Sequence, residues 1–148
     1  MKEVKSRPGC SLHGSLPCTV WSTWQNMAVA RYGIQYKRKL EARRLESVKL
    51  LNNFISLADV VLAQGGEISF EWPKNCLGWL RQELIEFITR HELYSVLVDG
   101  CATGMCATDG TPVLKQWRFI TSSHRQAVSL AELRCQHGKD FKHASVEG

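Results

Sequence analysis

The chain has 148 residues, of which 44% are hydrophobic and 22% are charged, and these values are ordinary for one globular domain with a buried core. It contains no run of about eighteen apolar residues, and no apolar stretch follows its charged N-terminus, so the sequence predicts neither a membrane span nor a signal peptide. We therefore expect an intracellular protein, with cytoplasm and nucleus left open.

The formal net charge is +5, and the chain has six cysteines. A moderate basic excess permits binding to nucleic acid without requiring it. Because the sequence lacks a signal peptide, we expect reduced thiols rather than a set of disulfides. It also lacks a Cys-x-x-Cys pair, which removes the strongest zinc-ribbon and redox signatures.

Residues 1–14 contain Pro8 and two glycines and show no periodicity, which predicts a flexible leader. Residues 15–20 are expected to form a short strand end that leads into a loop at Cys18. A Pro-Cys pair that enters a loop rich in aromatic and hydroxyl side chains is typical of a held, partly exposed thiol.

Apolar residues recur at three- and four-residue steps from about Tyr36 to Gln64, which predicts a long helix that ends at Gly65-Gly66. Gly33 is expected to interrupt any helix before it. Residues 67–71 alternate polar with apolar and predict a short strand, which Trp72-Pro73 would stop.

The second half of the chain predicts four further elements before a tail, residues 135–148, with no predictable structure. A helix is expected over 79–91 and a strand, buried on both faces, over 94–98. Asp109-Gly110 between two apolar runs predicts a hairpin. A last helix is expected over 124–134, capped by Ser122 or Ser123.

Strands that alternate with helices predict a single α/β domain over residues 15–134, with a mostly parallel sheet closed by an antiparallel hairpin. Open α/β sheets place their chemistry at the carboxyl ends of strands. Cys18 and Glu71 are both expected at such ends. A thiolate can attack an electron-poor ring, and a carboxylic acid can protonate or orient that ring.

Three motifs resemble those of the catalytic half of cytosine-5 DNA methyltransferases. The family has Pro-Cys-Gln followed by an aromatic residue and Ser, then Glu-Asn-Val, then Gln-x-Arg-x-Arg. The corresponding segments here are Pro17-Cys18-Thr19-Val20-Trp21-Ser22, Phe70-Glu71-Trp72-Pro73 and Gln116-Trp117-Arg118. The resemblance implies that Cys18 attacks cytosine C6, that Glu71 assists at N3 and that Arg118 makes a supporting contact.

Residues 15–148 also resemble methyltransferase-like segments of retroelement polyproteins. This resemblance implies a partial Rossmann-like methyltransferase sheet. Cytosine-5 DNA methyltransferases bind S-adenosylmethionine on a glycine-rich turn, and the residues before Cys18 are too few to contain such a turn. We therefore expect a truncated, inactive domain whose N-terminal cofactor half is missing, and which would bind S-adenosylmethionine only if that half were supplied. A sheet without its first strands would also leave an unpaired edge open to self-association.

The alternative to a methyltransferase-like domain is a non-catalytic module that binds nucleic acid or is stapled by zinc. Six basic residues and two glutamates occupy the start of the long predicted helix. These charged residues have two interpretations: they form either the solvated face of a helix or a surface that binds along phosphates. The six basic residues are Lys37, Arg38, Lys39, Arg43, Arg44 and Lys49.

The tail offers three metal-binding side chains, Cys135, His137 and His143. Structural zinc takes four ligands in a tetrahedron, so this set lacks one. A second set of three, formed by Cys10, His13 and Cys18, is also open as a small metal site. Cys101 and Cys106 are expected to be small packing residues rather than ligands.

Overall fold

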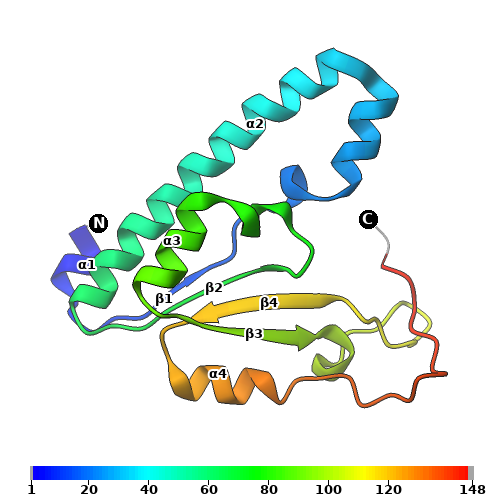
Figure 1. The fold of residues 1–148 in the computed structure, drawn as a ribbon. Coiled ribbons are helices and arrows are strands. Elements are labelled where there is room, and N and C mark those ends of the chain that lie inside the picture. Colours follow the sequence, from blue (N-terminus) through cyan, green and yellow to red (C-terminus); the bar gives the residue numbers. More distant parts are fainter. Residues whose placement is uncertain (1, 147–148) are drawn as a thin grey trace.

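A four-stranded open sheet forms the centre of the fold, and its strands lie in the order β1-β2-β4-β3 (Figure 1). The structure is a computed structural model that describes residues 2–146. Strand β1 pairs with β2 in parallel, whereas β4 runs antiparallel to both of its neighbours, β2 and β3. The strands are β1 (Leu12–Gly14), β2 (Ile68–Pro73), β3 (Tyr94–Asp99) and β4 (Gln116–Thr121).

Helices cover the two faces of this sheet unequally (Figure 1). Helices α2 (Trp24–Ala63) and α3 (Gln82–Arg90) lie on one face, and α4 (His124–Ala131) lies on the other, against β3 and β4. A short helix, α1 (Lys2–Ser6), packs against α2. None of the helices in the described part of the chain is both long and apolar enough to cross a bilayer.

The predicted mixture of helices and strands is confirmed, but a mostly parallel sheet is not. Only β1 and β2 form a parallel pair. The reason is the position of β4, which enters between β2 and β3 and runs opposite to both. Strands β2 and β3 run in the same direction, but β4 lies between them, so they do not pair with each other.

The segment that was expected to be a flexible leader contains both α1 and β1. Three residues are too few to show an alternating pattern, which explains why the sequence does not reveal β1. Gly14 fits here because a Cβ at this position would lie 2.5 Å from the Phe54 ring. The strand expected over 15–20 is replaced by a loop and one turn of 3-10 helix, Thr19–Trp21.

Helix α2 begins at Trp24, twelve residues before the predicted start, and breaks at Gly33 as expected (Figure 1). The φ and ψ angles of Gly33 are 77° and −161°, a conformation that only glycine adopts readily. The two arms of the bend are joined where the Tyr36 hydroxyl donates a 2.6 Å hydrogen bond to the Gln25 side chain.

Two other boundaries, one hairpin and the burial of one strand differ from the sequence-based expectations. Strand β2 continues to Pro73, its last residue, and α3 begins at Gln82 after a separate 3-10 turn, Leu77–Leu80. The hairpin expected around Asp109-Gly110 forms only an isolated bridge, because β4 pairs with β3 and β2 instead. Strand β3 lies at the sheet edge, so its first two residues are exposed rather than buried.

The core lies between the sheet and helices α2 and α3, and aromatic rings fill its centre. Phe70 of β2 is fully buried and contacts Phe54 of α2, with ring centroids 5.0 Å apart. Trp72 and Trp79 meet Phe70 edge to face at 4.9 and 5.8 Å. Such edge-to-face pairs stabilise a core beyond the area that they bury.

Phe70→Ala should lower the free energy of unfolding by about 3 to 5 kcal/mol, because it removes a buried ring and leaves a cavity among three aromatic neighbours. Urea denaturation followed by circular dichroism measures this change. Val128→Ala, on the exposed side of α4, is the matched control and should cost less than about 0.5 kcal/mol. Equal effects of the two substitutions would contradict the position of the core.

Asp59 of α2 connects that helix to the end of α3. Its carboxylate accepts two hydrogen bonds of 3.0 Å from Arg90 and lies 2.6 Å from His91 Nε2. Burial alone would raise the pKa of Asp59, but the hydrogen bonds to His91 and Arg90 outweigh it and hold this pKa below its usual value. The folded state therefore favours the ionised carboxylate.

Because the folded-state pKa of Asp59 is lowered, its stabilisation should be complete above pH 3.8, its usual value, and be lost as the pH falls through the lower folded value. Asp59→Asn should therefore destabilise the protein at neutral pH, by less than about 1 kcal/mol because the pair is part-exposed. The difference from wild type should close in acid. Denaturation across this pH range tests the claim, and Asp140→Asn is the control; a gap that widened in acid would contradict it.

Candidate metal centre

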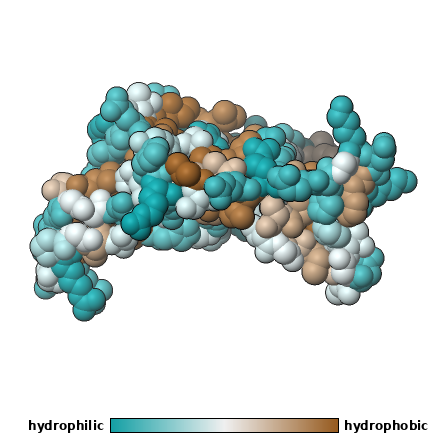
Figure 2. All heavy atoms as spheres, turned by 90° about the horizontal axis from the view of Figure 1, so that it is seen from below, coloured by the Kyte–Doolittle hydropathy of each residue, from teal (hydrophilic) through white to brown (hydrophobic). Residues whose placement is uncertain are grey.

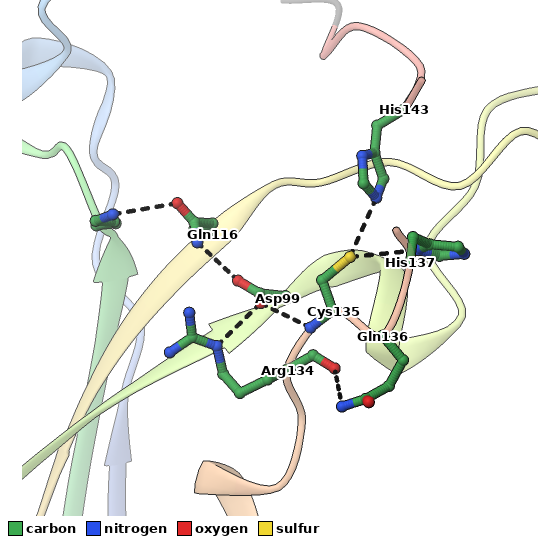
Figure 3. Close-up of polar contacts among 8 residues, drawn as sticks. Asp99, Gln116, Arg134, Cys135, Gln136, His137 and His143 are labelled. Atoms are coloured by element: carbon green, nitrogen blue, oxygen red, sulfur yellow. Dashed lines mark hydrogen bonds and ion pairs between the residues drawn. The ribbon is translucent and has the colours of Figure 1, made fainter. Parts of the chain in front are cut away.

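Four side chains with metal-binding atoms gather at one end of the sheet. Cys101 lies in a 3-10 turn, Gly100–Thr103, directly after β3, and Cys135, His137 and His143 follow α4. One ligand atom from each residue lies within 4.8 Å of all the others. Figure 3 shows both imidazole rings directed at the Cys135 sulfur, with Nδ1 of His137 at 3.3 Å and Nε2 of His143 at 3.4 Å.

The carboxylate of Asp99, the last residue of β3, holds Cys135 in position (Figure 3). Its Oδ2 atom accepts a 2.8 Å hydrogen bond from the Cys135 backbone N–H and a 2.9 Å bond from Arg134 Nε. Its Oδ1 atom accepts a 2.8 Å bond from Gln116 of β4. The side chain of Asp99 is only 3% exposed, so these bonds are shielded from water.

Backbone contacts fix both ends of the segment that carries three of the four ligands. Before Cys135, the Asp99 backbone N–H donates to the Leu133 carbonyl at 2.9 Å. After His143, the Ala144 N–H donates to the Pro112 carbonyl, also at 2.9 Å. Between these points, the Phe141 ring stacks on His137 with centroids 4.0 Å apart and sets the direction of that imidazole.

Two of the donor–donor distances at this cluster match those that a tetrahedral zinc ion imposes. Zinc lies about 2.3 Å from sulfur and about 2.0 to 2.1 Å from imidazole nitrogen, so a tetrahedral angle separates the two donors by about 3.5 Å. The two sulfur–nitrogen distances of 3.3 and 3.4 Å agree with this edge. The residues present therefore fit a metal ion in donor chemistry, and the two measured sulfur–nitrogen distances fit its spacing.

Two pKa values near the cluster are shifted. Burial raises the pKa of the Cys101 thiol, and the neighbouring Cys135 and Asp99 raise it further. Burial would also raise the pKa of Asp99, but the hydrogen bonds from Cys135, Gln116 and Arg134 outweigh burial and lower it. Asp99 is thus an ionised hydrogen-bond acceptor beside the two thiols.

The structure brings together all three ligands predicted in the tail and adds Cys101, which the sequence indicated as a packing residue. Cys101 lies 34 positions before Cys135, so no local spacing reveals it. Within residues 2–146, the second predicted set does not form a group with metal-ligand geometry. His13 lies in β1 and contacts Ser69, whereas Cys10 and Cys18 pack against the core.

The three predicted catalytic residues do not face one common site in the described part of the chain. Trp72 and Arg118 are register partners in β2 and β4, so their side chains share a face of the sheet. Glu71 is the neighbour of Trp72 and therefore points to the opposite face, where Ser15 donates a hydrogen bond to it. Their catalytic roles stay a prediction.

Cys18 and Arg118 lie on the side of the sheet that carries the core. Cys18 is half-buried against the core, next to Cys76. Burial raises the pKa of Cys76 to about 11, and the nearby Cys18 adds to this shift. The Arg118 guanidinium lies over the Trp79 ring at 4.5 Å, Ser95 accepts its Nε proton, and burial lowers its pKa.

The six basic residues predicted to bind nucleic acid all lie on α2. Five of them are exposed. Arg44 is the exception, because its Nε donates to the Val20 carbonyl at 2.9 Å and its guanidinium lies over the Trp21 ring. The exposed ones are Lys37, Arg38, Lys39, Arg43 and Lys49.

Comparison of the chain with protein-family models, with curated proteins and with solved structures finds no match. The function of the chain is therefore inferred from its residues and their geometry.

Asp99→Asn should loosen the segment that carries three of the four ligands. Asparagine has one acceptor oxygen, so it cannot receive the bonds from Gln116 and from Cys135 together. We expect a loss of about 1 to 3 kcal/mol in unfolding free energy, because a buried donor is left unpaired. Hydrogen exchange at the Cys135 amide should accelerate. The exposed Glu132→Gln is the control, and unchanged exchange in Asp99→Asn would contradict the role of this carboxylate.

Proposed function

We propose that the protein is a non-catalytic α/β module whose C-terminal segment is stapled to the sheet by one zinc ion. The ligands are Cys101, Cys135, His137 and His143. The observation that carries this proposal is the convergence of their four donor atoms within 4.8 Å.

The donor set favours a structural ion over a catalytic one. Structural zinc sites are closed by four protein ligands from cysteine and histidine, whereas catalytic sites keep one position for water or substrate. Two cysteines and two histidines supply four such ligands here. The Asp99 bond to the Cys135 N–H and the Phe141 ring against His137 supply the outer contacts that orient ligands in such sites.

A zinc ion at this position would stabilise a segment that has little other support. Residues 132–146 contain no helix or extended strand, and their contacts with the body are concentrated at Asp99 and at the 112–113 loop. The ion would join the turn after β3 to this segment at three further points. Such binding energy contributes directly to folding.

The methyltransferase-like hypothesis from the sequence depends on Cys18, Glu71 and Arg118 acting on one substrate. Its support is the order of three short motifs. Glu71 and Arg118 lie on opposite faces of the sheet, and this placement adds no support to the hypothesis. The geometry therefore favours the zinc-stapled module as the function to test first.

Elemental analysis of the purified chain should find about one zinc per molecule, and a strong chelator should lower the melting temperature. Cobalt in place of zinc should give the visible spectrum of tetrahedral coordination with thiolate ligands. Cys135→Ser should abolish stoichiometric zinc binding, and Cys101→Ser should weaken it strongly.

Cys106→Ser is the matched control, because Cys106 is an exposed thiol that is not among the four ligands. This variant should bind zinc and melt as the wild type does. Wild-type protein that refolds with zinc in the buffer but retains none after gel filtration would overturn the proposal. Equal zinc binding by Cys135→Ser and Cys106→Ser would do so as well.

A further inference from the structure

The whole net charge of the protein lies in the first part of α2. Residues 24–50 contain seven basic and two acidic residues, a net charge of +5. The remaining twelve basic and twelve acidic residues cancel. Figure 1 shows that this part of α2 extends away from the sheet and bends back at Gly33, so the charge is carried by a projecting arm.

Four of the seven basic side chains on this arm are free to bind a ligand. Arg44 is held by the Val20 carbonyl, Lys37 lies 4.0 Å from Glu41, and Arg31 lies over the Tyr32 ring. The other four are exposed and have no ion-pair partner among the residues that the structure describes. They are Arg38, Lys39, Arg43 and Lys49.

These four cations share one half of the helix surface. An α-helix has about 3.6 residues per turn, so residues four or eleven positions apart lie on the same side. Lys39 and Arg43 are four apart, and Arg38 and Lys49 are eleven apart. Because Arg38 and Lys39 are neighbours in sequence, the two pairs form adjacent rows over three turns.

We propose that this basic half of α2 binds the phosphate backbone of nucleic acid without reading its sequence. The charge complementarity is direct: four unpaired cations along a rigid rod meet a regularly spaced row of phosphates. Binding of this kind releases counterions and is strongly salt-dependent. It is independent of the zinc proposal, since none of the four residues is a metal ligand.

An anionic membrane is the other large polyanion that such a helix meets, and the structure argues against it. A helix that lies in a membrane surface inserts an apolar face opposite its basic one. The apolar face of α2 is already occupied, because Leu40, Leu51 and Phe54 are buried in the core of the protein. The exposed Ile34 and Leu45 lie on the same side of the helix as Arg38 and Lys49, four positions from each, rather than on a face opposite the cations.

Fluorescence anisotropy with the full-length chain tests the proposal. The probes are labelled 20-mers of duplex DNA, single-stranded DNA and single-stranded RNA, each in two unrelated sequences. Binding to at least one probe type should be equal for its two sequences. For duplex DNA, the logarithm of the association constant should fall against the logarithm of salt with a slope of about −4, the value for four phosphate contacts.

The test variant is the triple substitution Arg38→Gln, Lys39→Gln and Arg43→Gln, because glutamine keeps a good helix propensity. It should reduce the slope by about 3 and weaken binding at least tenfold at low salt, by about 1.4 kcal/mol. Circular dichroism verifies that the variant is folded. The control triple, Lys5→Gln, Arg7→Gln and Arg125→Gln, removes the same charge elsewhere and should leave the slope within about 1 of wild type.

Three results would overturn the proposal. Equal weakening by the two triple variants would show that net charge, rather than this side of α2, attracts the probe. Tighter binding to phosphatidylserine vesicles than to any nucleic-acid probe, lost in the test variant, would assign the surface to a membrane. Absence of salt-dependent binding to all three probe types would equally exclude it.

Discussion

The buried carboxylate of Asp99 joins the parts of this molecule that matter most for its proposed function. It ends β3, accepts a hydrogen bond from β4 through Gln116 and receives the first backbone N–H of the ligand-bearing segment at Cys135. A charge so shielded from water is tolerated here because three donors, one of them the Arg134 cation, hydrogen-bond to it. The sheet, the turn with Cys101 and the tail therefore depend on one another, and the candidate metal centre lies where they meet.

The sequence predicts the elements with a strong local signal and misses those that depend on distant residues. The three-and-four periodicity correctly indicates α2 beyond Gly33, and Ser123 does cap α4, since its side chain accepts from the Gln126 N–H. Strand β1 is too short to show a pattern. The order of strands follows from tertiary packing, so a hairpin signal at Asp109-Gly110 could not reveal that β4 would insert between β2 and β3.

The candidate site shows the same division. Cys135, His137 and His143 are close in sequence, so their types and spacing predict a metal site with one ligand missing. Cys101 supplies the fourth donor only because β3 ends beside the segment that follows α4. The orientation of Glu71, in contrast, could be predicted from the sequence: strand alternation, read from Phe70 and Trp72, turns its side chain away from the core.

This alternation along β2 has a consequence for the architecture as a whole. One side of the strand is dry, with Ile68, Phe70 and Trp72 buried. On the other side, the buried Ser69 lines a cleft of about 660 Å³ and Glu71 is part-exposed. A sheet sandwiched between two helical layers needs apolar side chains on both sides of its inner strands. Here a second helical layer over β1 and β2 would bury the Glu71 carboxylate and the His13 imidazole away from water. Helix α4 packs against β3 and β4 on this side of the sheet, and Figure 2, seen from that side, shows hydrophilic residues interspersed with hydrophobic ones.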